Sequence, residues 1–270
     1  MRAVTDGPRI AVLDWAMYET LAELGQSPVA VAELRSLRGV TAMPPAAGVA
    51  DLGLRGGPNL EALAQVAPDL ILSSNFYAFL AGPLARIAPV FAPDLFLAGK
   101  PVLPRVLNAL ESLAERLGDP AAGHRARRRI EAAFDGAAGR VAADGRPVLL
   151  ATIGDARHVQ VFGTDSLYGG VLPRLGLRNA WEGRTAFGFN APVPLSRLLD
   201  FPEARLAVLG PVPQGAKRAL AHGALWQALP MVRAGRVLHL PEAANPYGGA
   251  PSALRLAQGL AARPERGLGE

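Results

Sequence analysis

Two strand-length apolar runs joined by a helical segment constrain the fold of this chain most strongly. The first run ends near Asp51 and the second near Leu72, and Leu60–Ala67 between them carries apolar residues at helical spacing. A right-handed crossover of this kind places both strands in one parallel sheet. The segment therefore predicts an α/β fold.

Arg55 and Tyr77 each follow one of these two strands, in polar or glycine-rich sequence. Ligands of open parallel sheets bind beyond the carboxyl ends of the strands. We therefore expect the guanidinium of Arg55 and the phenol of Tyr77 to face one cleft. A surface ion pair of Arg55 with Asp51 or Glu61 is the simpler alternative.

The composition excludes several classes of protein. Half of the 270 residues are hydrophobic, and 30 glycines and 24 prolines indicate many short elements rather than a helical bundle. The absence of cysteine rules out disulfides, zinc thiolate sites and thiol catalysis. The four histidines lack ligand spacing, so we expect no metal bound by the protein. The net charge of +5 is only weak evidence for a nucleic-acid partner.

Strands and helices alternate along the chain. The pattern predicts a strand over Arg9–Leu13, a helix from Trp15 to Leu24 and a strand over Pro28–Ala32. From about Pro104 to Ala142 helix formers dominate, and Gly118–Pro120 interrupts them. Arg146–Thr152 and His158–Phe162 are typical of a β-hairpin.

The second half resembles the first in outline, which indicates a weak internal duplication. Pro192–Leu199 with the strand Ala204–Gly210 matches the helix and strand of Pro58–Ser73. We therefore expect two α/β lobes, residues 1–119 and 144–270, joined by one long helix over residues 120–143.

Phosphate-binding loops and hydrolase nucleophile motifs are absent from the sequence. Ser166 is the best candidate nucleophile, but an N-cap of a helix over Leu167–Leu175 is the simpler interpretation. A cytoplasmic enzyme using Ser166, His158 and Asp155 is the alternative of a different class, although the three lie too close in sequence for a persuasive triad. The basic run Arg125–Arg129 favours an exposed helix face over nucleic-acid binding, because aromatic residues do not interrupt it.

Aromatic residues gather in three segments that we expect to be loops. They are Phe76, Tyr77 and Phe79 in the first, Phe187 and Phe189 in the second, and Tyr247 in the third. Rings packed under their own loops would explain any one segment. A shared ligand cleft explains all three better.

Five stretches carry a resemblance to a known family over nearly the whole chain. They are Asp51–Glu61, Leu84–Pro89, Asp155–Gly163, Asn179–Gly183 and Leu225–Arg236. In this order they are similar to the bacterial periplasmic substrate-binding proteins for iron(III) hydroxamate siderophores, the ferrichrome-binding type. The resemblance implies a class III binding-protein fold with two α/β lobes, one long helix and a shallow cleft between the lobes.

The resemblance also implies function. Arg55 and Tyr77 match positions that hydrogen-bond the iron-bound hydroxamate oxygens, and Asn190 and Tyr247 match positions lining the cleft. Phe76, Phe187, Phe189 and Asn245 complete the expected ligand-binding set. We expect a monomeric binding protein rather than an enzyme, with no cofactor of its own because the iron stays in its chelator. Its partners would be a ferric hydroxamate siderophore and an ABC transporter permease, not nucleic acid.

The first residues, Met1–Pro8, lack the apolar core of a signal peptide. By resemblance we expect a periplasmic location, with a signal that these residues do not include. The chain departs from the family at Gly39, Gly188 and Asn245, where tryptophans are common, and at Gly82 and Ser196, where acidic residues dock the permease. Haem, cobalamin or another iron chelate, such as a catecholate, is the alternative ligand.

Overall fold

The computed structural model describes residues 7–141, 144–183, 185, 190–243 and 245–262. Contacts divide the chain into two compact units. The first unit comprises the chain up to Phe96, Pro104–Arg129 and Tyr247–Pro251. The second comprises Leu97–Leu103, Ile130–Pro246 and the chain from Ser252. The lobe boundaries expected from the sequence stay a prediction.

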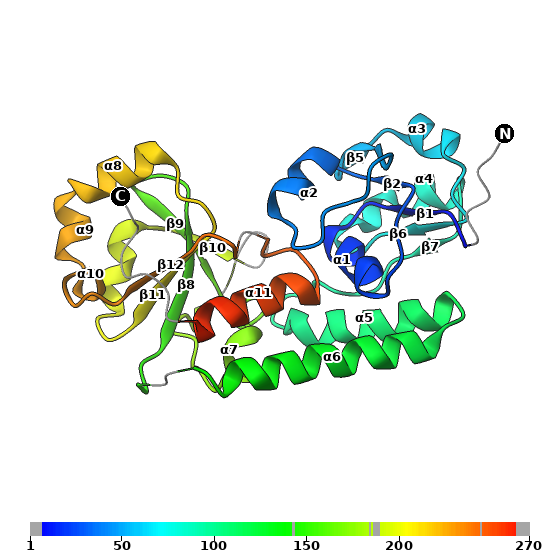
Figure 1. Ribbon diagram of the computed structural model, residues 1–270. Coiled ribbons are helices and arrows are strands. Elements are labelled where there is room, and N and C mark those ends of the chain that lie inside the picture. Colours follow the sequence, from blue (N-terminus) through cyan, green and yellow to red (C-terminus); the bar gives the residue numbers. More distant parts are fainter. Residues whose placement is uncertain (1–6, 142–143, 184, 186–189, 244, 263–270) are drawn as a thin grey trace. The chain divides into compact units, whose positions relative to one another are not determined.

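The first unit contains a parallel sheet in the order β3-β2-β1-β6-β7 (Figure 1). Its strands are β1 (Ile10–Val12), β2 (Ala30–Val31), β3 (Ala50–Asp51), β6 (Leu70–Leu72) and β7 (Val90–Phe91). From β1 the chain builds outward to β2 and β3, then returns to the other side of β1 with β6. The carboxyl ends of β1 and β6 therefore form the switch point at which such sheets bind ligands.

Helices and one small hairpin connect these strands. They are α1 (Trp15–Glu23), α2 (Leu34–Val40), the hairpin β4 (Gly53–Leu54) and β5 (Gly57–Pro58), α3 (Leu60–Gln65), the 3₁₀ helix η1 (Asn75–Leu80) and α4 (Ala81–Ala85). Side chains begin several of them: Asp14 caps α1, Asn59 caps α3 and Ser74 caps η1. The strand–helix–strand unit is confirmed, since β3 and β6 share one sheet, although β2 and β1 lie between them.

Two long helices follow the first sheet, α5 (Val102–Arg116) and α6 (Pro120–Ala138). The predicted break is confirmed: Gly118 has φ +83°, and Asp119 accepts a hydrogen bond from the Ala122 amide at 2.9 Å. Helix α6 begins in the first unit and continues into the second.

Several basic residues of α6 are ion-paired. Arg127 contacts Glu111 at 2.6 Å, and Arg129 contacts Glu23 at 2.8 Å. The helix therefore presents a mixed surface, as expected for an exposed face. No helix in the described part of the chain is long and apolar enough to cross a membrane.

The second unit contains a mixed sheet in the order β10-β9-β8-β11-β12. Its strands are β8 (Val148–Ile153), β9 (His158–Phe162), β10 (Asn190–Pro194), β11 (Arg205–Leu209) and β12 (Val237–Leu240). The pairs β8–β9 and β9–β10 are antiparallel, whereas β8–β11 and β11–β12 are parallel. The predicted hairpin is confirmed. The two sheets differ in strand direction, so the second does not repeat the first.

Short helices cover this sheet: α7 (Val171–Arg174), the 3₁₀ helix η3 (Leu195–Asp200), α8 (Gln214–Ala221), α9 (Ala224–Ala228) and α10 (Pro230–Arg233), with α11 (Ala250–Ala261) closing the fold. Their apolar faces bury Trp226, Met231 and Leu220 against the strands.

Two predicted helices of this unit are shorter or start later than expected, since α7 begins at Val171 and η3 at Leu195. The helix over Leu167–Leu175 is only the short α7, and Ser166 caps a turn before it. Pro192 and Pro194 lie in strand β10 instead of starting a helix. Proline is tolerated there because β10 is an edge strand.

Candidate ligand-binding site

Polar and aromatic side chains collect at the carboxyl edge of the first unit's sheet. Asp14 and Trp15 lie shortly after β1, Glu33 shortly after β2, and Ser74 shortly after β6. Arg55 reaches this edge from the turn of the hairpin that follows β3. The chain order of the parallel strands thus brings together residues that are up to 60 positions apart in the sequence.

Asp14 and Ser74 form the buried floor of this edge. Asp14 Oδ2 accepts a hydrogen bond from the Ser74 hydroxyl at 2.6 Å, and Oδ1 accepts from the amides of Ala16 and Met17 at 2.7 and 3.2 Å. Burial raises the pKa of the Asp14 carboxyl, although these hydrogen bonds and the charge of Arg55 act to lower it. Asp14 thereby fixes the start of α1 against the start of η1.

Arg55 is held on two sides. Its Nε donates to Glu33 Oε2 at 2.8 Å, and its guanidinium carbon lies 3.7 Å from the centre of a Trp15 ring. The Trp15 ring is itself fixed, because its Nε1 donates to the Ala32 carbonyl at 3.1 Å. A cation over a desolvated tryptophan face is stabilised by up to about 2 kcal/mol. Since Glu33 binds Nε, the Nη hydrogens are the part of the guanidinium that can turn to a ligand.

Tyr77 lies beside Arg55, as predicted. Its side chain is buried, and the Arg55 guanidinium is near enough for its charge to act on the phenol. Burial raises the pKa of the Tyr77 phenol, and the negative charge of Asp14 adds to the effect, while Arg55 opposes it. The phenol therefore keeps its proton at neutral pH and can donate a hydrogen bond.

Apolar side chains surround this polar pair. Phe76 packs edge-on against Tyr77 and Phe96, with ring centres 5.2 and 5.9 Å apart, yet 46% of Phe76 stays exposed. Phe79 and Leu54 are each 67% exposed. Exposed large apolar residues next to a fixed cation are typical of a surface that binds an amphipathic ligand. The three aromatic residues lie in the 3₁₀ helix η1 and not in a loop.

The remaining predicted site residues are distributed over both units. Asn190 and Asn245 are buried in the second unit. The backbone N–H of Asn245 donates to the Tyr168 hydroxyl at 3.1 Å. Tyr247 is half-buried in the first unit, and its segment is tied to α1 because the Gly249 amide donates to buried Glu19 at 2.7 Å. Phe187 and Phe189 lie outside the described residues.

The residues of the enzyme alternative do not form a triad. The Ser166 hydroxyl is buried, donates to the Gly163 carbonyl at 2.7 Å and accepts from the Gly169 amide at 2.8 Å. His158 and Asp155 are both exposed, and Asp155 Oδ1 accepts from the Arg157 and His158 amides in the tip of the β8–β9 hairpin. Ser166 and Asp155 therefore both organise turns.

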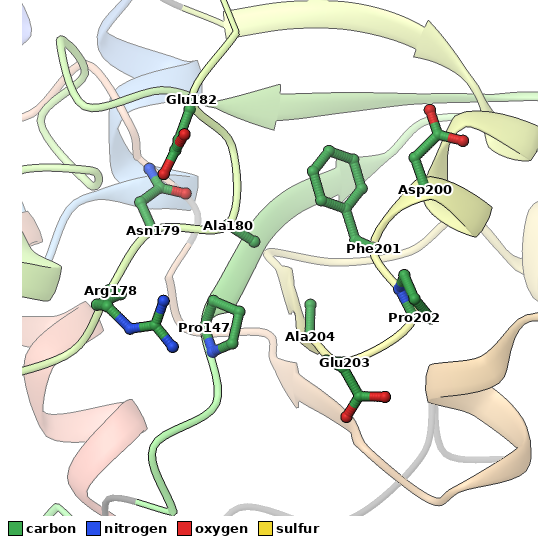
Figure 2. A pocket seen from close by; sticks show the side chains of 10 residues that line it. All are labelled: Pro147, Arg178, Asn179, Ala180, Glu182, Asp200, Phe201, Pro202, Glu203 and Ala204. Carbon is green, nitrogen blue, oxygen red and sulfur yellow. The ribbon is translucent and has the colours of Figure 1, made fainter.

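A pocket of about 220 Å³ lies in the second unit, and Figure 2 shows the side chains that line it. Pro147 and Ala204 on its wall precede β8 and β11, so the pocket lies at the amino ends of these parallel strands. Ligands of such sheets bind at the opposite, carboxyl ends.

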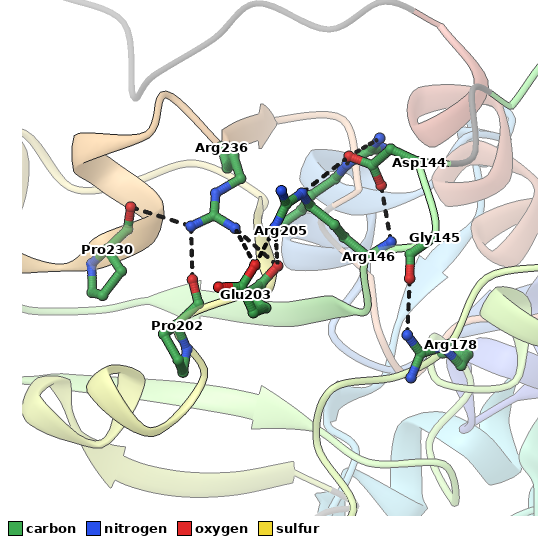
Figure 3. A network of polar contacts seen from close by, with 9 residues as sticks. All are labelled: Asp144, Gly145, Arg146, Arg178, Pro202, Glu203, Arg205, Pro230 and Arg236. Atoms are coloured by element: carbon green, nitrogen blue, oxygen red, sulfur yellow. Dashed lines mark hydrogen bonds and ion pairs between the residues drawn. The ribbon is translucent and has the colours of Figure 1, made fainter.

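Ion pairs occupy the neighbourhood of this pocket (Figure 3). Glu203 pairs with Arg146 and Arg236, and Asp144 pairs with Arg205 at 2.7 Å. Arg236 also donates to the carbonyls of Pro202 and Glu203 at 2.7 and 3.0 Å. These arginines join the loops that precede β8, β11 and β12, which indicates a structural role.

The sequence-based prediction missed Asp14, Trp15 and Glu33. The rule that selected Arg55 and Tyr77 would also have selected them, because each follows a strand of the same parallel sheet. Trp15 was assigned only to the start of a helix. The rule points to the right edge of the sheet but does not show which side chains meet there.

Comparison with known proteins places these observations in a family. Residues 10–244 match the family model described as periplasmic binding protein. The chain is 34% identical over 260 residues to the Iron(3+)-hydroxamate-binding protein FhuD of Escherichia coli (strain K12), covering 96% of this chain and 87% of the relative.

Solved structures agree. The siderophore-binding protein FhuD from Vibrio cholerae, bound to Fe3+–Desferal, superposes with a TM-score of 0.83 at 28% identity, covering 93% of this chain and 95% of that one. The catecholate-siderophore binding protein VctP from the same organism gives 0.68 at 14% identity, covering 94% and 92%, so the fold alone does not select the chelate. The chain belongs to the periplasmic binding protein family.

Proposed function

We propose that this protein captures a ferric hydroxamate siderophore in the periplasm and delivers it to an ABC importer. The observation that carries the proposal is the fixed pair of donors, Arg55 and Tyr77, beside exposed Phe76 and Phe79. The 34% identity to the E. coli hydroxamate-binding protein supports the same ligand class.

The chemistry of the pair suits such a ligand. Hydroxamate oxygens bound to Fe(III) carry partial negative charge, and a guanidinium and a protonated phenol offer several donors to them. The iron keeps its chelator as its ligand set, so the protein supplies hydrogen bonds and apolar contacts and needs no cofactor. Each charge-assisted bond contributes about 1.5–3 kcal/mol.

Binding of ferrichrome by wild-type protein and by Arg55→Ala, measured by calorimetry, tests the proposal. We expect the variant to bind about tenfold to a hundredfold more weakly, because the loss of one charge-assisted bond has that size. Arg129→Ala removes another ion-paired arginine of the first unit and serves as the matched control, with unchanged affinity expected. Equal affinity of the wild type and Arg55→Ala would exclude the assigned role.

A further inference from the structure

The positive charge of Arg55 is compensated inside the candidate site. Glu33 Oε2 lies 2.8 Å from Arg55 Nε, and both side chains are only about one-fifth exposed, 22% and 21%. Glu33 Oε1 also accepts a hydrogen bond from the backbone amide of Arg55 at 3.3 Å. One carboxylate thus fixes both the turn that carries Arg55 and the direction of its guanidinium.

The backbone of Glu33 has an unusual conformation, which directs its carboxylate to Arg55. Its φ is +51°, in the left-handed region that residues other than glycine and asparagine rarely adopt. The Glu33 amide donates to the Gly53 carbonyl at 2.6 Å, which joins it to the same hairpin. Although Glu33 occupies the N-cap position of α2, its side chain makes no capping bond. The carboxylate is therefore directed to Arg55 instead of to its own helix.

The other charged groups around Arg55 and Glu33 do not give the site a net positive charge. The charged groups that act on the Tyr77 phenol are Asp14, Arg55 and Glu33, which are one cation and two carboxyl groups. A site that attracted its ligand by net positive charge would leave the arginine uncompensated. Here the guanidinium offers directional donors with little excess charge.

We propose that Glu33 is a specificity-determining residue that selects ligands by charge. By binding Nε and cancelling the charge of Arg55, it favours neutral or cationic ferric hydroxamates and disfavours polyanionic chelates such as ferric tris-catecholates. The inference rests on the proposed function, because it assigns Glu33 a role at the same ligand site.

Glu33→Gln tests the charge directly, since the amide keeps the size of the side chain and can still accept from Arg55. Dissociation constants for ferrichrome, which is neutral, and for a ferric tris-catecholate, which is a trianion, are measured at low and high salt. We expect affinity for the trianion to rise about tenfold at low salt and this gain to shrink at high salt, because one negative charge has been removed from a partly exposed site. Ferrichrome affinity should change by no more than about threefold, because this complex has no net charge for the removed carboxylate to repel.

Two further variants make the test specific. Glu23→Gln removes a carboxylate from another 2.8 Å arginine pair of the same unit and should leave both affinities unchanged. Glu33→Asn removes the charge with a residue that tolerates positive φ, and it replaces Glu33→Gln if that variant does not fold. In a double-mutant cycle with ferrichrome, Glu33→Ala should weaken binding in the wild type but not in Arg55→Ala, since Glu33 positions Arg55.

The outcomes separate this inference from the proposed function. If the wild type binds ferrichrome but Glu33→Gln leaves the ratio of the two affinities unchanged, charge selection by Glu33 is refuted while the proposed function stands. If the wild type binds no ferric hydroxamate, the proposed function itself is wrong and the inference falls with it. Ferrichrome binding by the wild type, together with a raised, salt-sensitive affinity of Glu33→Gln for the trianion, supports both.

Discussion

Replacing Asp14 by asparagine should make the protein less sensitive to pH while keeping its fold. Asparagine keeps Oδ1 as the acceptor for the Ala16 and Met17 amides, so the cap of α1 survives. Its amide nitrogen stands where Oδ2 accepted from Ser74, and the Ser74 hydroxyl can rotate to accept instead. The substitution therefore removes the ionisable group while keeping the cap of α1 and one hydrogen bond to Ser74.

The sign of the pH effect follows from the direction of the pKa shift. Burial raises the Asp14 pKa above its ordinary value of 3.8, so the folded protein holds this proton more tightly than the unfolded chain does. The free energy of unfolding then falls as the pH rises from about 3.8 to the folded-state pKa and is constant above it. Each tenfold difference in proton affinity between the two states corresponds to about 1.4 kcal/mol.

Urea unfolding of wild type and Asp14→Asn between pH 4 and pH 8 provides the assay. The variant should equal or exceed the wild type in stability at neutral pH, and its advantage should disappear towards pH 4. Asp14→Ala is the contrasting variant: it loses the cap, which costs about 1 kcal/mol, and leaves the Ser74 hydroxyl without its acceptor. A variant Asp14→Asn that is less stable than wild type at neutral pH and gains stability towards pH 4 would refute the reasoning.

Three further predictions concern the second unit. Gly169→Ala should destabilise it by about 3 kcal/mol or more, because a β-carbon there would lie 1.9 Å from the Gly163 carbonyl oxygen. A β-carbon added at Gly215 in α8 has no other atom within 4 Å, so Gly215→Ala should stabilise the protein by about 0.5 kcal/mol. Unfolding midpoints equal to that of the wild type, followed by tryptophan fluorescence, would contradict both predictions. Burial raises the pKa of Asp144, but the Arg146 amide and the Arg205 guanidinium hold it below 3.8, so Asp144→Asn should cost at most about 1 kcal/mol at pH 7 after allowance for solvent screening. This cost should shrink as the pH falls below about 4 and vanish below the folded-state pKa of Asp144, and a cost that does not shrink in acid would show that the carboxylate charge is not its source.

Much of the first unit could be predicted from sequence because its signals are local. The Gly118–Pro120 break, the capping side chain of Asp119 and the alternation of apolar runs all act over a few residues. The meeting of Arg55 and Tyr77 also followed, since it requires only a parallel sheet and the ends of its strands.

Other features depend on contacts that the local sequence does not contain. The hairpin around Arg55 has strands of two residues, too short for a periodic signal. The sequence around Pro192 and Pro194 predicted the start of a helix. The two prolines instead lie in an edge strand, and the position of a strand in a sheet depends on tertiary contacts that the local sequence does not contain. The left-handed backbone of Glu33 is likewise stabilised by Gly53 and Arg55, which lie about 20 residues further along the chain.

Titration of the purified protein with ferrichrome, ferrioxamine and coprogen tests the central claim most directly. Trp15 lies under the proposed ligand donor Arg55, so its fluorescence should report occupation of the site. The account predicts saturable, one-site quenching by at least one of the three ferric hydroxamates, with a weaker response in Arg55→Ala. The absence of a response to all three, together with binding of haem, cobalamin or a ferric catecholate, would contradict it.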